Sequence, residues 1–65
     1  MKTLNVTTND RLAQVKVRGS DTDELTPRMA RAALQIAAGL GAYGIVSDGR
    51  KAYKVTKTTR RLKDY

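Results

Sequence analysis

The stretch that decides the fold is residues 26–41, which read TPRMARAALQIAAGLG. Thr26 suits an N-cap, and Pro27 suits the first helical position, where its missing N–H costs no hydrogen bond. Strong helix formers follow as far as Gly39 and Gly41, which favour the left-handed conformation that ends a helix. The sequence therefore predicts one helix that begins at Pro27 and ends near residue 40.

The predicted helix has an apolar face, because its apolar residues recur at helical spacing. The residues expected on that face are Met29, Ala30, Ala33, Leu34, Ile36, Ala37 and Leu40. The opposite side carries Arg28, Arg31 and Gln35, which we expect to face solvent. Because the apolar face is rich in Ala, the helix can lie close to the layer that it covers.

A hairpin is predicted before the helix, from residues 4–8 and 11–18 with a two-residue turn at Asn9-Asp10. This turn sets Val6 opposite Ala13, Leu4 opposite Val15 and Lys2 opposite Val17. The apolar residues then share one face of the sheet. A slip of one residue would scramble that separation, so the register is well specified.

A second hairpin is predicted after the helix, from residues 42–46 and 50–56 around Ser47-Asp48-Gly49. A type I turn with a glycine bulge would pair Val46 with Arg50 and Tyr43 with Tyr53. That register predicts a core face of Tyr43, Ile45, Tyr53 and Val55, and a basic surface of Gly44, Val46, Ala52, Lys54 and Thr56. A two-residue Asp-Gly loop is the alternative and would mix the two faces.

The order of elements is ββαββ, which predicts an α+β fold. We expect an antiparallel sheet of about four strands with the Ala-rich helix packed on one face, in a single small domain over 1–65. Residues 58–65 could extend the last strand, form a helical turn or fray. Residues 57–65 could accordingly form a flexible basic tail.

Charge is the main functional signal, because the chain carries a formal net charge of +7. Between residues 50 and 63, seven of fourteen residues are Lys or Arg and none is acidic. Such a run indicates a polyanionic partner, most commonly DNA or RNA, held mainly by its phosphates and with low sequence specificity. The predicted nucleic-acid-binding residues are Arg50, Lys51, Lys54, Lys57, Arg60, Arg61, Lys63, Lys16 and Arg18.

Two other interpretations of this basic surface stay open. It could bind an acidic partner protein, as a small phage-encoded accessory protein or inhibitor would, with Tyr43, Ile45 or Tyr53 as the apolar anchor. It could also be a solvated edge strand whose cations block unwanted pairing. If the second hairpin takes its other register, Tyr43 or Tyr53 could stack on bases. An exposed sheet edge in so small a chain also makes a homodimer a possible oligomeric state.

Several classes of function are not expected. The chain has no His and no Cys, so the usual bases, nucleophiles and tight metal ligands are missing and we predict neither an enzyme nor a cofactor. The acidic segment Asp21-Thr22-Asp23-Glu24 lacks the remaining ligands of a calcium loop, so an acidic cap before the helix explains it better. No apolar stretch is long enough to span a membrane and no signal peptide is evident, which predicts a cytoplasmic protein.

Overall fold

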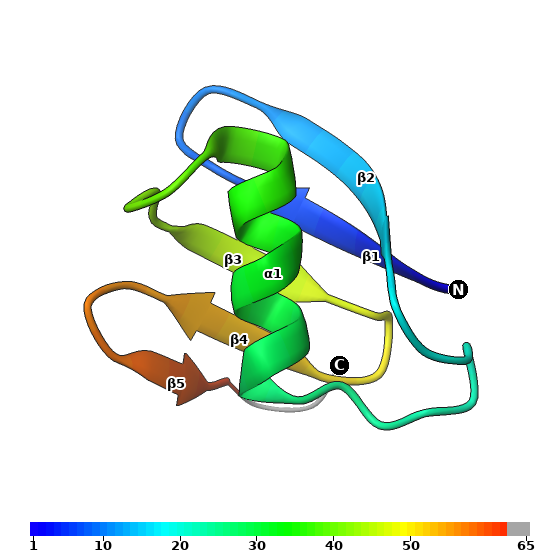
Figure 1. Ribbon diagram of the computed structural model, residues 1–65. Helices are drawn as coiled ribbons and strands as arrows, with labels where there is room; N and C mark the ends of the chain where they lie inside the picture. The colour runs from blue at the N-terminus through cyan, green and yellow to red at the C-terminus, as the bar shows by residue number, and fades with distance from the viewer. Residues whose placement is uncertain (63–65) are drawn as a thin grey trace.

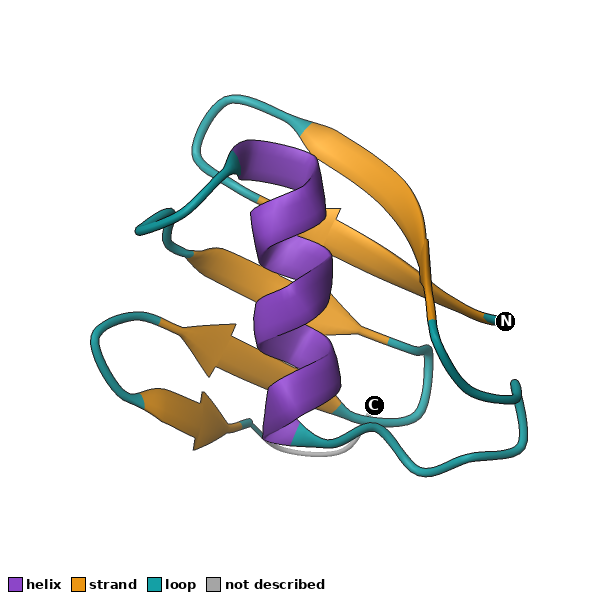
Figure 2. Cartoon of the chain, viewed as in Figure 1, coloured by secondary structure: helices purple, strands orange, loops and turns teal. Residues whose placement is uncertain are grey.

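The computed structural model describes residues 1–62 as a five-stranded antiparallel sheet with one helix across one face (Figure 1). The elements are β1 (Lys2–Thr7), β2 (Leu12–Val17), α1 (Pro27–Ala38), β3 (Gly44–Ser47), β4 (Ala52–Val55) and β5 (Thr59–Arg61). The strand order is β2-β1-β3-β4-β5, and over residues 1–62 no helix covers the second face of the sheet (Figure 2). The predicted α+β class is confirmed, but there are five strands rather than four, because residues 59–61 pair with β4.

The first hairpin has the predicted register. Val6 pairs with Ala13, Leu4 with Val15 and Lys2 with Val17. The Thr8 amide donates a hydrogen bond to the Arg11 carbonyl at 2.9 Å, which leaves Asn9-Asp10 as the two-residue turn. The alternation of apolar and polar residues and the Asn9-Asp10 turn are both local features of the sequence, and both specify this register.

The helix begins as predicted and ends at Ala38. The Thr26 hydroxyl accepts a hydrogen bond from the Met29 amide at 3.2 Å, which is an N-cap. Gly39 ends the helix with φ of 94°, and its amide donates to the Gln35 carbonyl at 2.8 Å. A positive φ favours glycine, which has no Cβ to clash there.

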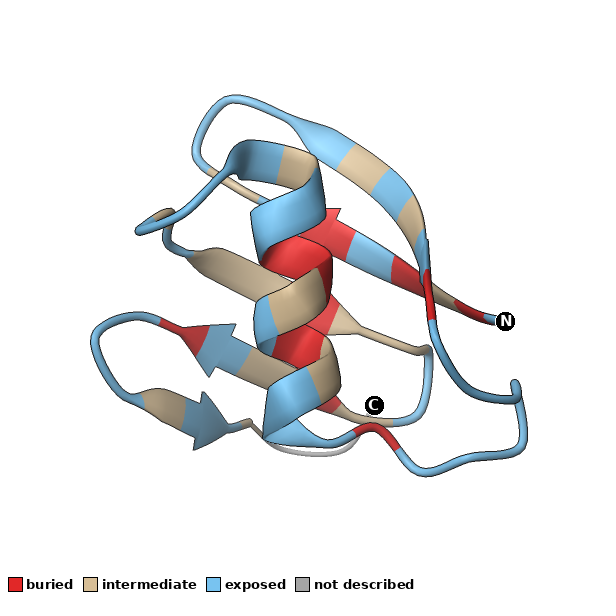
Figure 3. Cartoon of the chain, viewed as in Figure 1, coloured by how far each residue is buried: buried red, intermediate tan, exposed pale blue. Residues whose placement is uncertain are grey.

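The predicted buried face of the helix is wrong at two residues. Ile36 is 62% exposed and Leu40 is 85% exposed. The buried stripe is centred on Ala30, Ala33 and Leu34 (Figure 3). Ile36 lies about 200° around the helix from Leu34, at about 100° per residue. Leu40 lies beyond the glycine that ends the helix, so helical spacing no longer applies to it.

The predicted register of the second hairpin is also wrong. Val46 pairs with Tyr53 and Ser47 pairs with Ala52, so neither the three-residue loop nor the Asp-Gly loop occurs. The Asp48 amide instead donates to the Lys51 carbonyl at 3.2 Å, which centres the turn on Gly49-Arg50. Asp48 holds this turn with its carboxylate, which accepts from the amides of Arg50 at 2.9 Å and Lys51 at 2.8 Å.

This register changes which residues of β3 face the helix. Val46, expected on the basic surface, is fully buried, whereas Tyr43, expected in the core, is 54% exposed. Ile45 pairs with Lys54 on the opposite side of the sheet. Tyr53 and Val55 do pack against the core, as predicted.

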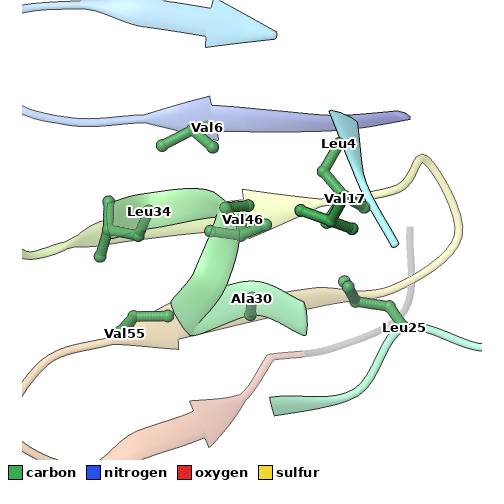
Figure 4. Close-up of a cluster of buried hydrophobic side chains, with 9 residues drawn as sticks. Leu4, Val6, Val17, Leu25, Ala30, Leu34, Val46 and Val55 are labelled. Atoms are coloured by element: carbon green, nitrogen blue, oxygen red, sulfur yellow. The ribbon is translucent and has the colours of Figure 1, made fainter. Parts of the chain in front are cut away.

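The core lies between α1 and the sheet (Figure 4). Its buried residues are Leu4, Val6, Val17, Leu25, Ala30, Ala33, Leu34, Val46 and Val55. Gly44 allows the layers to approach, because a Cβ there would lie 2.6 Å from the Thr7 carbonyl oxygen and 3.2 Å from Leu34 Cδ1. Ala52 is also buried, although the predicted register placed it on the basic surface.

Candidate nucleic-acid interface

The uncovered face of the sheet carries two cations side by side. One row of side chains crosses all five strands on this face: Leu12, Thr7, Ile45, Lys54 and Arg60. Lys54 and Arg60 are direct partners across β4 and β5, and both are exposed. None of the five strands contains an Asp or a Glu. Like charges directly opposite each other destabilise a sheet, so this pair makes the face strongly attractive to an anion.

The turn between β4 and β5 adds Lys57. Thr56 holds this turn, because its hydroxyl donates to the Thr58 carbonyl at 2.9 Å and accepts from the Thr58 amide at 3.3 Å. Lys57 is exposed at the end of the hairpin. We call residues 52–61 the basic hairpin. Its turn and its uncovered face bring together three of the predicted site residues, Lys54, Lys57 and Arg60.

The helix supplies two further cations on the other side of the basic hairpin. The Arg31 Nε donates to the Thr59 hydroxyl at 2.6 Å. Arg28 and Arg31 line a groove of about 500 Å³ between α1 and the β4–β5 turn, which also includes Thr58 and Thr59. Both arginines were expected to face solvent and are not among the predicted site residues. Their i, i+3 spacing on one helix face was the available signal.

Tyr43 lies beside two of these cations. A second groove of about 220 Å³ contains Arg31, Tyr43 and Lys57 in its lining. Tyr43 is 54% exposed, so its ring is accessible from this groove. The arrangement combines an aromatic surface with positive charge, the combination that single-strand binders use for bases and phosphates.

The remaining predicted site residues do not lie together with Lys54, Lys57 and Arg60. Arg50 and Lys51 lie in the β3–β4 turn, and Lys51 forms an ion pair with Glu24. Lys16 lies on β2 and Arg18 directly follows it, at the other side of the sheet. β2 is four strand spacings from β5, which is about 19 Å. Arg61 pairs with Tyr53 and therefore lies on the helix side of β5. Lys63, like Tyr65, lies outside the described residues.

The described acidic residues lie in loops, mostly at the end of the molecule away from Lys57. Asp21 accepts from the Thr3 amide at 3.2 Å, and Asp23 accepts from the Ser20 amide at 2.9 Å. Glu24 forms an ion pair with Lys51. The acidic segment therefore orders its own loop and the β3–β4 turn. Figure 1 shows this loop and the β3–β4 turn on the right, with the β4–β5 turn on the left.

Lys2 and Asp48 form a buried ion pair that was not predicted from the sequence. Lys2 Nζ lies 3.2 Å from Asp48 Oδ2, and the two side chains are 3% and 5% exposed. Lys2 Nζ also donates to the Asp21 carbonyl at 3.3 Å. Burial raises the pKa of Asp48, but the Lys51 and Arg50 amides and the Lys2 ammonium outweigh it, so this pKa is below its ordinary value. The predicted pairing with Val17 already placed Lys2 on the core face, which was the available signal.

No protein-family model, curated protein or solved structure shows a significant match to this chain. Among residues 1–62, no three His, Cys, Asp or Glu side chains lie close enough together to hold a metal ion. Over the same residues, no helix has the length and the apolar content that crossing a bilayer requires.

Proposed function

We propose that this protein binds DNA or RNA through the basic hairpin, mainly by phosphate contacts and with low sequence specificity. The observation that carries the proposal is the Lys54–Arg60 pair on the uncovered face of the sheet. Two cations held directly opposite each other cost stability, and a phosphate bound between them would relieve that repulsion. If neither position had a binding role, a neutral or acidic residue at one of the two positions would make the hairpin more stable.

The cations around the basic hairpin support a contact with several phosphates. Lys54 and Arg60 lie on one side, Lys57 lies in the turn, and Arg28 and Arg31 lie on the helix side. Five phosphate contacts would give a slope of log K against log salt of about −4.5 for duplex DNA or about −3.5 for a single strand. Binding should therefore weaken steeply as salt is raised.

Tyr43 favours a single strand over a duplex. Its ring is exposed beside Arg31 and Lys57. A base stacked on an aromatic side chain contributes about 1–3 kcal/mol, and unpaired bases are free to stack in this way. A strand that follows the groove lined by Arg31, Tyr43 and Lys57 would place its phosphates near the two cations and a base near Tyr43.

Fluorescence anisotropy with labelled single- and double-stranded DNA and RNA tests the proposal. We expect the tightest binding with a single strand and a large loss of affinity between about 50 and about 200 mM salt. Affinity that does not change with salt would refute a phosphate contact. Equal affinity for single strands and duplexes would remove the role proposed for Tyr43 and leave the phosphate contact standing.

An acidic partner protein is the second candidate, and exposed Tyr43 is the observation that favours it. An aromatic anchor surrounded by cations suits a protein interface as well as a base. A pull-down with the tagged protein from nuclease-treated lysate separates the two. A stoichiometric acidic protein that survives nuclease supports this candidate, whereas captured material that nuclease removes supports nucleic acid.

A further inference from the structure

The strand β2 presents an open edge to solvent. It is the last strand in the sheet order, and among the described residues it pairs only with β1. The Thr8–Arg11 hydrogen bond closes the hairpin, and antiparallel hydrogen bonds recur at every second residue from such a pair. This alternation directs the backbone amides and carbonyls of Leu12, Gln14 and Lys16 toward the open edge.

The two edges of the sheet differ in how well they resist pairing. β5 has three residues, and two of them are Arg, which is a common way to discourage another strand from adding. β2 has six residues, contains neither Pro nor Gly, and carries a single charge at Lys16. It therefore keeps the length that an added strand needs and lacks the residues that interrupt strand pairing.

An apolar groove lies beside β2, between this strand and α1. It has a volume of about 360 Å³, and Val17, Met29 and Ala32 supply its apolar lining. Val15, Met29 and Ala32 contact the core but are only partly buried, so the core is incompletely covered here. Arg18 and Arg28 also line the groove, and no acidic residue does.

We propose that β2 binds an extended segment of a partner protein as a sixth strand, with aliphatic and acidic side chains alternating along that segment. Alternate side chains of an added strand point to opposite faces. The aliphatic ones would enter the groove over Val17, Met29 and Ala32. The acidic ones would lie beside Lys16 on the other face, and an acidic end would reach Arg18.

Charge decides between a partner and a second copy of this chain. A second copy paired antiparallel about Gln14 would set Lys16 opposite Leu12, so Lys16 and Arg18 would meet no opposite charge in a protein whose net charge is already +7. An acidic segment meets these cations with opposite charge. The proposal does not rest on nucleic-acid binding, because the backbone edge that it uses lies at the opposite side of the sheet from the basic hairpin, although Arg28 and Ala32 line both grooves.

Peptide binding tests the chemistry of the occupant. The probe is a fluorescent peptide of alternating valine and glutamate, compared by anisotropy with a valine–lysine peptide and with a valine–glutamate peptide whose alternate amides are N-methylated. We expect the first peptide to bind, and each of the other two to bind at least about tenfold more weakly. NMR should show the largest amide shifts at Leu12, Gln14 and Lys16.

Two variants separate this site from the rest of the surface. Gln14→Pro should weaken peptide binding by about tenfold or more and leave the fold intact, since proline is tolerated where the amide points away from the sheet. Gln14→Thr keeps the amide and should bind like the unchanged protein. The double variant Lys54→Glu with Arg60→Glu should also keep its affinity for the peptide.

Several results would overturn the proposal. These are no binding of the valine–glutamate peptide, equal binding by Gln14→Pro, or amide shifts confined to β4 and β5. Sedimentation that shows a dimer, together with slow hydrogen exchange of the Gln14 amide without peptide, would assign the edge to a second copy instead. Nucleic-acid binding by Gln14→Pro should be unchanged. A result that overturns strand addition at β2 therefore leaves the proposed nucleic-acid binding intact.

Discussion

Lys2 and Asp48 form an ion pair at 3.2 Å with almost no exposure to solvent, and this pair joins the first strand to the β3–β4 turn. The Asp48 carboxylate also accepts two amide hydrogen bonds within its turn, so one side chain fixes both the local turn and a long-range contact. Asp48 therefore adds a side-chain contact to the β1–β3 pairing that holds the second hairpin beside the first.

Removing the ammonium should strongly destabilise the fold. Lys2→Met leaves the Asp48 carboxylate buried without its cation, and breaking a buried pair in this way costs about 3–5 kcal/mol. Denaturation with urea should show this loss of unfolding free energy. Lys16→Met on the exposed face of β2 is the control and should change stability by less than about 0.5 kcal/mol. Similar effects of the two substitutions would contradict the buried pair.

Acid should also weaken the fold through Asp48. The pKa of this residue is lower in the folded protein than the unfolded value of about 3.9. Its contribution to stability is therefore fully present above that value and is lost as the pH falls through the folded pKa. Unfolding free energy measured against pH should fall across this acidic range. Asp48→Asn should be less stable at neutral pH and should show a smaller acid-dependent loss, whereas an unchanged pH profile would rule out this role.

The helix face can be checked with two similar truncations. Leu34→Ala removes a buried side chain and should cost about 3 kcal/mol, because a cavity remains in the core. Ile36→Ala removes a side chain that is 62% exposed and should cost less than about 1 kcal/mol. Urea denaturation of both variants gives the comparison. A larger loss for Ile36→Ala would mean that the helix is rotated from the orientation described.

Charge reversal in the basic hairpin should abolish most nucleic-acid binding. Lys54→Glu with Arg60→Glu replaces two phosphate-binding cations and lowers the net charge from +7 to +3. We expect a loss of affinity of at least about a hundredfold at low salt, with a salt slope reduced by about 2. Lys16→Glu with Arg18→Glu makes the same change in net charge at the other edge and should cost much less. Equal losses would indicate a response to net charge alone.

A single reversal should separate stability from binding. Lys54→Glu places a carboxylate directly opposite Arg60, so a repulsive cross-strand pair becomes attractive. Such exposed pairs contribute about 0.2–1 kcal/mol, so the unfolding free energy should rise slightly while nucleic-acid binding weakens. Thermal unfolding and anisotropy on one sample measure both effects. A variant that loses stability would show that Lys54 and Arg60 do not repel each other in the native sheet.

The first hairpin and the start of the helix were predictable, because their determinants are local. The Asn9-Asp10 turn and the alternation around it specify one register, and Thr26 with Pro27 specifies one helix start. In the second hairpin, the glycine after Asp48 fits loops of several lengths, so the sequence alone leaves the register ambiguous. Its register is accompanied by contacts far apart in the sequence, because β3 pairs with β1 and the Asp48 carboxylate meets Lys2.

The sequence by itself determined the sign of the surface, the segment where positive charge concentrates, and the α+β class. Only the tertiary structure decided which cations act together. Pairing β4 with β5 sets Lys54 beside Arg60, and the helix adds Arg28 and Arg31. Lys51 instead forms an ion pair with Glu24. The physical reason is that strand register sets the face on which each side chain lies, and an odd shift in register reverses that face.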